Sequence, residues 1–535
     1  MFHLQALPAD LFILTTEHLV AAIGIRKALR LRTVNKAFDT AILHAICISQ
    51  VVDVDDPATP GLVSHIHPRL KGMIIAVKSR SSWRMNKRYV HVVAMVNQSL
   101  DNLIGETDAR QKQSRHEEVA AAIIPVYSTN DVPLTAAIRE QNLLSGAVVV
   151  GNVPIIRALL AGSHSIHDTA DVNGATPYFH SPLTLAAARG CMETGRILLD
   201  HGARLDSIGS VSAERVELPS QAEWNNRDVY EQLRDMSSRS ASSSPLSAAV
   251  FAGNTEILQT FLHPSRRLPL TSLAYLRAIL VAARAGRLDL IELLFDTIGK
   301  RMSDFCQFDK QMMWAAVGGC QKEVVQMLLD HGTDVHAFSS RQGYERSTLS
   351  LAASMGKVDM IHFLMQRGAD PNLPRDGEIG CLPIEAAALY GQEEVVELLI
   401  DRSPYLSRAL FKATEGGQFR VIKWLLSKFP DLLHSWEYEN ITVGQLAVTN
   451  ASIMGHLDVI SFLVERGVSL SNGWGETETL PLNIAKERFQ PWVAKHLISL
   501  GADGGAGEIA PCSEPPFCLK GLRMDERTWR WAGDY

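Results

Sequence analysis

Small and apolar residues recur along this chain in one pattern, Ala-x-x-x-Gly followed by apolar residues at helical spacing. The clearest copies run over residues 186–199, 282–294, 352–364, 387–399 and 451–463. In each copy the Ala-rich half predicts a short first helix, whose small side chains let neighbouring helices approach closely. The apolar half predicts a second helix with one buried stripe. Repetition at this period indicates stacked units rather than one globular core.

The residue that ends each predicted first helix, which we call the anchor, is mostly glycine. The ten anchors are Gly151, Gly190, Gly253, Gly286, Cys320, Gly356, Gly391, Gly417, Gly455 and Phe489. Glycine is expected there because it enters the left-handed conformation that ends a helix without steric cost. A second glycine follows some anchors by twelve residues, at Gly202, Gly332, Gly368, Gly467 and Gly501. It is expected to end the second helix in the same way.

These units resemble ankyrin repeats over residues 143–503, because the anchors scatter around the ankyrin period of about 33 residues. Ankyrin units commonly open with T-P-L-H, and variants of that phrase stand at 181–184, 244–247, 347–350 and 480–483. The resemblance implies an all-α solenoid of about ten divergent repeats. The 26-residue interval between Gly391 and Gly417 leaves almost no room for a projecting hairpin.

Four segments are expected from the composition. They are an N-terminal helical domain at 1–50, a basic helical linker at 51–142, the repeats at 143–503 and a tail at 504–535. The repeats contain a Ser-rich insertion at 207–244, too polar to build a core and expected to be a surface loop or a disordered spacer. The tail is read either as a docked cap or as a recognition peptide.

The first fifty residues resemble an F-box, with Leu-Pro-Ala-Asp-Leu at 7–11 and a second amphipathic stretch at 28–38. Two helices are expected, separated by residues 20–27. The family implies binding to a Skp-type adaptor, with a cullin ubiquitin ligase behind it. By position, the adaptor-facing candidates are Leu7, Pro8, Leu11, Leu19, Leu29, Leu31, Val34 and Phe38. An F-box followed by ankyrin repeats is similar to an arrangement found in fungal proteins. Alternatively, the same helices only cap the array, since a terminal repeat needs its apolar face covered.

Residues 57–100 carry basic residues and no acidic ones, with Trp83 and Tyr89 among them. Basic residues interleaved with aromatic residues can bind phosphates and stack on bases. A helical connector with a solvated basic face is the commoner meaning of this pattern. Nucleic acid is therefore not the expected partner, in keeping with a net charge of −6.

Motifs for chemistry are missing from the sequence. It contains no phosphate-binding loop, zinc-protease helix or nucleophile elbow, so we expect no enzyme activity, cofactor or metal site. His201 and His331 precede helix-ending glycines and are expected to bond exposed carbonyls. Cys191, Cys320 and Cys381 are expected to fill small buried positions.

Seven scattered cysteines favour a reducing compartment over a disulfide framework. With no signal peptide or apolar span in the pattern, a cytoplasmic or nuclear protein without membrane contact is expected, monomeric outside its complexes.

Two functions remain. The chain is either a substrate receptor of a Skp–cullin–F-box ubiquitin ligase, whose repeats bind an unknown target, or an ankyrin scaffold whose N-terminal helices only cap the array.

Overall fold

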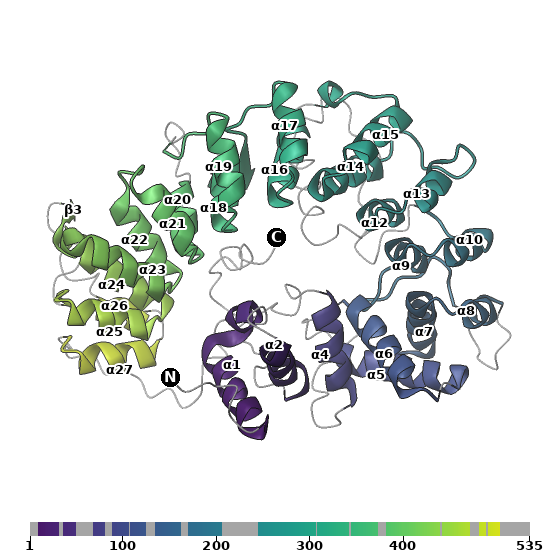
Figure 1. The fold of residues 1–535 in the computed structure, drawn as a ribbon, viewed down its shortest axis with the longest axis horizontal. Coiled ribbons are helices and arrows are strands. Elements are labelled where there is room, and N and C mark those ends of the chain that lie inside the picture. Colours follow the sequence, from purple (N-terminus) through teal and green to yellow (C-terminus); the bar gives the residue numbers. More distant parts are fainter. Residues whose placement is uncertain are drawn as a thin grey trace. The chain divides into compact units, whose positions relative to one another are not determined.

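The computed structural model describes the chain in fourteen stretches (Figure 1). These are residues 9–31, 36–49, 68–80, 88–105, 107–124, 134–161, 170–205, 244–305, 308–341, 344–372, 381–438, 441–470, 481–487 and 490–502. The described residues form two compact units. One unit takes those up to Val281 and Glu292–Lys300, and the other takes Ala282–Ile291 and those from Arg301 onward.

The chain begins with helix α1 (Ala9–Leu31), followed by α2 (Lys36–Leu43) and the π-helix η2 (His44–Ile48). Both α2 and η2 pack against α1. The helix break expected over residues 20–27 was wrong, because α1 runs through them without interruption. That segment contains no proline, and its single Gly24 is tolerated in a helix interior. The predicted second stretch at 28–38 is thus divided between the end of α1 and the start of α2.

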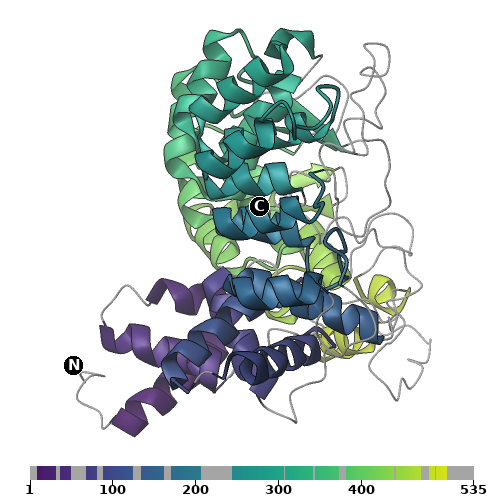
Figure 2. The same ribbon diagram turned by 90° about the vertical axis from the view of Figure 1, so that its right-hand side faces the viewer.

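Three helices of the expected linker, α4 (Pro68–Arg80), α5 (Arg88–Ile104) and α6 (Ala109–Ala122), form the next layer. Figure 2 shows the linker helices in indigo to blue. Helix α4 packs along α6. The two helices are so close at Gly72 that a side chain there would collide with the carbonyl oxygen of Glu117. Both α5 and α6 pack on α7, the helix that opens the repeats. The linker helices therefore cover the first repeat.

Ten helix pairs follow within the described residues, and each pair has a first and a second helix. In the N-terminal half the pairs are α7 (Ala136–Val150)/α8 (Val153–Leu160), α9 (Pro182–Arg189)/α10 (Met192–Asp200), α12 (Pro245–Ala252)/α13 (Thr255–Leu262), α14 (Ala274–Ala285)/α15 (Leu288–Ile298) and α16 (Phe308–Gly318)/α17 (Lys322–Asp330). In the C-terminal half they are α18 (Thr348–Ser354)/α19 (Val358–Gln366), α20 (Pro383–Leu389)/α21 (Glu393–Ile400), α22 (Leu406–Glu415)/α23 (Phe419–Lys428), α24 (Val443–Met454)/α25 (Leu457–Glu465) and α26 (Pro481–Glu487)/α27 (Pro491–Ser499). Short 3₁₀ helices lie at Met302–Asp304 and Pro430–His434.

The anchors behave as the sequence predicts. All eight anchor glycines have positive φ, and so do all five of the second glycines. Cys320 has φ +60° although it is not glycine, which confirms that the backbone conformation belongs to the repeat position. Phe489 lies outside the described residues.

First helices pack on first helices, as their small residues predict. In one unit α7 contacts α9 and α9 contacts α12, and in the other α16 to α26 form an unbroken series. Ala352, Ala387 and Ala451 are completely buried in this way. Each second helix buries the predicted stripe, as Val395, Val396 and Leu399 do in α21. The described helices therefore bury their apolar residues largely against neighbouring copies.

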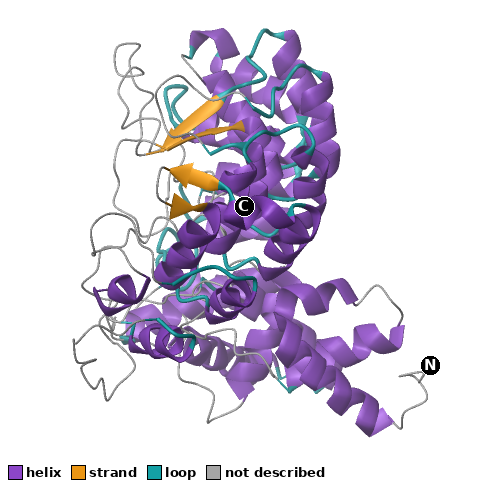
Figure 3. Cartoon of the chain, turned by 90° about the vertical axis from the view of Figure 1, so that its left-hand side faces the viewer, coloured by secondary structure: helices purple, strands orange, loops and turns teal. Residues whose placement is uncertain are grey.

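Two short hairpins add a small β component to this helical fold (Figure 3). Strand β1 (Phe338–Arg341) pairs antiparallel with β2 (Tyr344–Ser347), and β3 (Trp436–Tyr438) pairs with β4 (Ile441–Thr442). Each hairpin joins one helix pair to the next. Between α21 and α22, where the interval is shortest, only residues 401–405 connect the pairs, as the spacing predicts.

Several expectations fall on residues that the structure does not describe. The insertion at 207–244 lies outside the described residues except for Ser244, whose side chain accepts from the Ser247 backbone N–H at 3.2 Å and caps α12. The tail at 504–535 also lies outside them. Among the helices within the described ranges, none combines the length and apolar character needed to cross a membrane.

Candidate functional site

The F-box-like candidates are only partly placed. Leu7, Pro8 and Val34 lie outside the described residues, and Leu29 and Leu31 lie on α1 with side chains that are not described. Leu11 is 50% exposed, and so is Leu14 one turn later. Phe38 packs edge-on against Phe12, with ring centroids 5.4 Å apart, and Leu19 is half-buried. Phe12 and Phe38 thus join α1 to α2, while Leu11 and Leu14 stay open to solvent.

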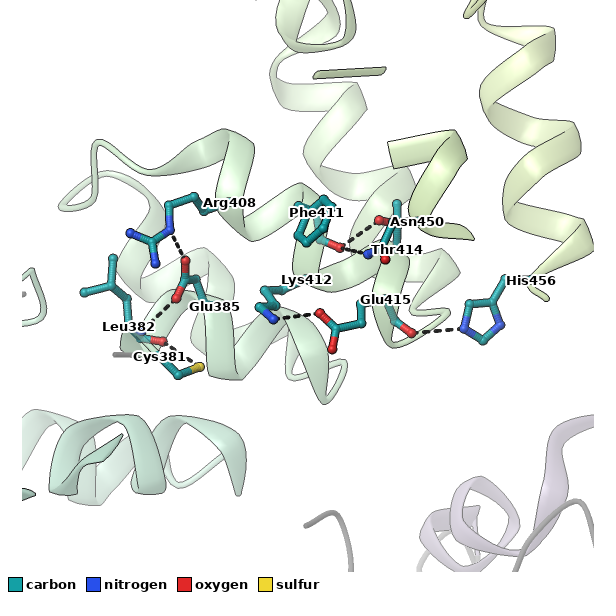
Figure 4. A network of polar contacts seen from close by, with 10 residues as sticks. All are labelled: Cys381, Leu382, Glu385, Arg408, Phe411, Lys412, Thr414, Glu415, Asn450 and His456. Atoms are coloured by element: carbon teal, nitrogen blue, oxygen red, sulfur yellow. Dashed lines mark hydrogen bonds and ion pairs between the residues drawn. The ribbon is translucent and has the colours of Figure 1, made fainter. Parts of the chain in front are cut away.

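A second candidate is the exposed side of first helices α20, α22 and α24, which we call the α22 face. It presents Arg408, Phe411, Lys412 and Glu415 from α22, supported by Glu385 of α20, Asn450 of α24 and His456 just before α25 (Figure 4). The four residues of α22 follow helical spacing, so they share one side of the helix. Phe411 is 37% exposed, whereas its neighbour Leu410 is completely buried.

Glu385 ties α20 to α22. Its carboxylate is 2% exposed, accepts from the backbone N–H of Leu382 at 2.8 Å and forms an ion pair with Arg408 Nε. Arg408 is 40% exposed and stacks near the ring of Tyr405, 5.5 Å from its centroid. The carboxylate fixes the Nε edge of the guanidinium, while the Arg408 side chain as a whole stays partly exposed.

Lys412 and Glu415 form an ion pair within α22, with 2.7 Å between Nζ and Oε2. Burial disfavours the charged lysine, but the charge and hydrogen bond of Glu415, with smaller effects of Cys381 and Glu385, raise the pKa of Lys412 above its ordinary value. Lys412 therefore stays protonated and paired with Glu415.

Two side-chain hydrogen bonds fix the backbone of α22 at Phe411. Asn450 of α24 donates its side-chain amide to the carbonyl of Phe411 at 3.1 Å, and the Thr414 hydroxyl donates to the same oxygen at 2.7 Å. These bonds hold the Phe411 backbone in place. The exposed ring consequently rests on a fixed support.

A further set of residues joins successive repeats, and the sequence reasoning missed it. The residue directly after an anchor donates a side-chain N–H to a carbonyl near the end of the preceding first helix. In the C-terminal half the four bonds are Gln392 to Ser354 at 3.0 Å, Gln418 to Leu389 at 3.1 Å, His456 to Glu415 at 3.1 Å and Gln490 to Ile453 at 3.0 Å. We call these four the amide ladder. The recurrence of Asn, Gln or His after seven anchors was the available signal.

The structure confirms the expectation for two histidines and contradicts the expectation for three cysteines. His201 and His331 lie within hydrogen-bonding distance of the carbonyls of Ile197 and Met327, at 2.8 and 2.7 Å, as expected. The expectation that Cys191, Cys320 and Cys381 are buried was wrong, since all three are only half-buried. No cluster of metal-ligating side chains occurs in the described part of the chain.

In the basic linker, one of the two aromatic residues and one of the lysines belong to the core. Tyr89 is completely buried and Lys78 almost so, which removes one of the two rings that could stack on a base. Trp83 lies outside the described residues. Lys71 donates to the carbonyl of Ile123 at 2.9 Å, and burial lowers the pKa of this lysine to about 8. These side chains serve packing between α4 and its neighbours.

Known families and proteins agree with the repeat pattern. Residues 312–409 and 349–435 match the family model described as "Ankyrin repeats (3 copies)". The ankyrin repeat and KH domain-containing protein mask-1 of Caenorhabditis elegans is 24% identical over 332 residues, which are 54% of this chain and 12% of that protein. The related protein CBG24701 of Caenorhabditis briggsae is 29% identical over 36% of this chain and 7% of its own length.

Among solved structures, the crystal structure of the human ASB11 ankyrin repeat domain matches 42% of this chain and 96% of its own, with 19% identity and a TM-score of 0.32. This chain spans only a small fraction of the two Caenorhabditis relatives.

Proposed function

We propose that this chain, an ankyrin-repeat protein, is a non-catalytic interaction module that binds a target protein through the α22 face. Ankyrin repeats suggest protein–protein interaction. The observation that carries the proposal is the exposed Phe411 ring, set between Arg408 and Lys412. Aromatic and arginine side chains are enriched at the energetic centres of interfaces.

Rigidity of the α22 face supports this assignment. Glu385 holds Arg408, Glu415 holds Lys412, and Asn450 fixes the Phe411 backbone. A surface that is already ordered loses less conformational entropy on binding. Arg408 and Lys412 keep N–H donors beyond their bonds to Glu385 and Glu415, so together with the aromatic ring they favour a target segment with a hydrogen-bond acceptor and an apolar side chain.

The test compares target capture by full-length wild type and Phe411→Ala, with the captured proteins identified by mass spectrometry. Leu293→Ala is the matched control, because Leu293 is also 37% exposed but lies on a second helix. We expect one target to be lost from Phe411→Ala and kept by Leu293→Ala. Retention by both variants would refute the role of the α22 face.

At the N-terminus, the proposal is that α1 docks a Skp-type adaptor, which would make the chain a substrate receptor of a Skp–cullin–F-box ubiquitin ligase. Two neighbouring leucines, Leu11 and Leu14, are each half exposed on one helix. A cap would bury them. Helices α5 and α6 already cover α7, so α1 is not required to close the array.

The second candidate function is a scaffold whose N-terminus only stabilises the fold. The continuity of α1 through residues 20–27 favours it, because the F-box resemblance implies two helices there. Co-purification with a Skp-type adaptor separates the two functions. The receptor requires that wild type retain the adaptor and that Leu11→Asp release it. Leu103→Asp, at a 44% exposed leucine of α5, is the control. A wild type that retains no adaptor supports the scaffold.

A further inference from the structure

Arg277 is a buried cation that forms no ion pair among the described residues. It lies on first helix α14 and is 8% exposed. Its guanidinium Nε is buried and has no hydrogen-bond partner. No ion pair joins this guanidinium to any carboxylate among the described residues.

Such an arrangement is unfavourable in the free protein. Removing a charged group from water is costly unless a counter-charge or hydrogen bonds compensate. Burial lowers the pKa of the Arg277 guanidinium to about 10, and no described carboxylate counters that effect. Groups that cost stability without a structural return are typical of binding sites.

Comparison of equivalent positions in two repeats, counted from their anchors, shows which group Arg277 lacks. Arg277 lies nine residues before its anchor Gly286, and Arg408 lies nine residues before Gly417. Arg408 is paired with Glu385, which lies six residues before the anchor of the preceding repeat. The equivalent residue for Arg277 is Ser247 of α12, six residues before Gly253. Serine therefore stands where the matching repeat provides a carboxylate.

Ser247 does not replace that carboxylate. Its hydroxyl is buried and receives a hydrogen bond from the Ser244 hydroxyl at 3.1 Å within α12. One turn further along α12 stands Phe251, a strongly exposed aromatic residue. Residues four apart share a helix face, so this ring lies next to the position of Ser247.

We propose that Arg277 binds a carboxylate of an acidic polypeptide segment, which takes the place that Glu385 occupies beside Arg408, with an apolar residue of that segment against Phe251. The site extends the proposed protein-binding function to a repeat remote in sequence from the α22 face. It predicts a preference for acidic segments, since a guanidinium and a carboxylate form paired, charge-assisted hydrogen bonds.

Stability of the full chain gives the first test. Arg277→Met should raise the unfolding temperature, because it removes an uncompensated buried charge. Arg408→Met should lower it, because it leaves Glu385 buried and unpaired. Ser247→Glu should also raise it, by supplying the counter-charge internally. A fall in unfolding temperature for Arg277→Met as large as that for Arg408→Met would overturn the proposal.

Binding gives the second test, with fluorescein-labelled hexaglutamate as the probe and fluorescence anisotropy as the readout. Wild type should bind it at low salt. Arg277→Met and Ser247→Glu should weaken binding at least about tenfold. Arg420→Met, which removes a cation from an exposed position, is the control for charge alone and should bind as wild type does. Equal affinity of wild type and Arg277→Met, or no binding by wild type, would refute the site.

The two proposals fail separately. Loss of target capture in Phe411→Ala together with unchanged hexaglutamate binding in Arg277→Met would leave the α22 face standing and remove the Arg277 site. The reverse pattern would remove the α22 face and keep Arg277.

Discussion

The side-chain amide of Gln418 donates to the backbone carbonyl of Leu389 in the preceding repeat, at 3.1 Å. The same side chain fills the space that a Cβ of Gly391 would need. Leu389 is near the end of first helix α20, where carbonyls lack helical partners. One side chain therefore satisfies an unpaired carbonyl and joins two repeats.

Gln418→Ala is expected to lower the free energy of unfolding by about 1 kcal/mol, since a net hydrogen bond and an interface contact are lost. His456→Gln is the matched control, because glutamine already serves that role at three other positions of the amide ladder. It should change stability little. Urea denaturation measures both, and equal losses for the two variants would contradict the role of the amide ladder.

Glycine at the anchor is predicted to be required for two reasons. Gly391→Ala introduces a Cβ at φ +71° and against Gln418, so it should destabilise by more than the ~1 kcal/mol expected of left-handed strain alone. Gly332→Ala is the comparison, since Gly332 has φ +88° but open space around its Cβ position. Thermal unfolding should place Gly391→Ala clearly below Gly332→Ala. The opposite order would show that the glutamine contact is unimportant.

We predict that the buried carboxylate of Glu385 destabilises the fold unless Arg408 pairs with it. Arg408→Met leaves the carboxylate buried and unpaired and should cost about 2 kcal/mol, less than a fully buried pair because the guanidinium is partly solvated. The double variant Glu385→Gln with Arg408→Met should recover part of this loss, because the buried charge is gone. Urea denaturation of the wild type, the two single variants and the double variant gives the coupling. Additive losses would mean that the two side chains do not interact.

We predict that the fold loses stability in acid because of Asp101 in α5. Lys112, Arg115 and His116 of α6 contact its carboxylate at 2.8, 2.7 and 3.1 Å. Burial opposes the charge of Asp101, but these three donors outweigh it and lower its pKa to about 2.

Because this folded pKa is below the unfolded value of about 3.9, the carboxylate stabilises the fold above pH ~4, and the stabilisation is lost as the pH falls toward 2. Asp101→Asn should therefore be about 2 kcal/mol less stable than wild type near neutral pH. The difference should shrink between about pH 4 and pH 2. Urea denaturation across this range measures it, and a deficit independent of pH would contradict the ion cluster.

Local features of the fold could be predicted from the sequence. The anchors depend on the φ of single residues, and glycine marks eight of the ten. Helical spacing of apolar residues is also local, which is why the stripe of α21 was found. At Cys320 the repeat period placed the turn even without glycine.

Features that join distant residues could not be predicted in this way. The amide ladder links Gln418 to Leu389 across 29 residues, and its partners are defined only once the repeats stack. The cover over α7 comes from α5 and α6, which show no pattern that assigns them to a repeat. Arg277 has an ordinary sequence context, and only its burial with an unpaired Nε sets it apart.

Photo-crosslinking tests the central claim, that the α22 face holds the target, most directly. A benzophenone amino acid is placed at position 411 in one chain and at position 293 in another, and each chain is irradiated in its cell extract. We predict that one protein is crosslinked from position 411 and not from position 293, and that Arg408→Glu in the same chain abolishes that crosslink. A target crosslinked from position 293 and absent at position 411 would contradict the account.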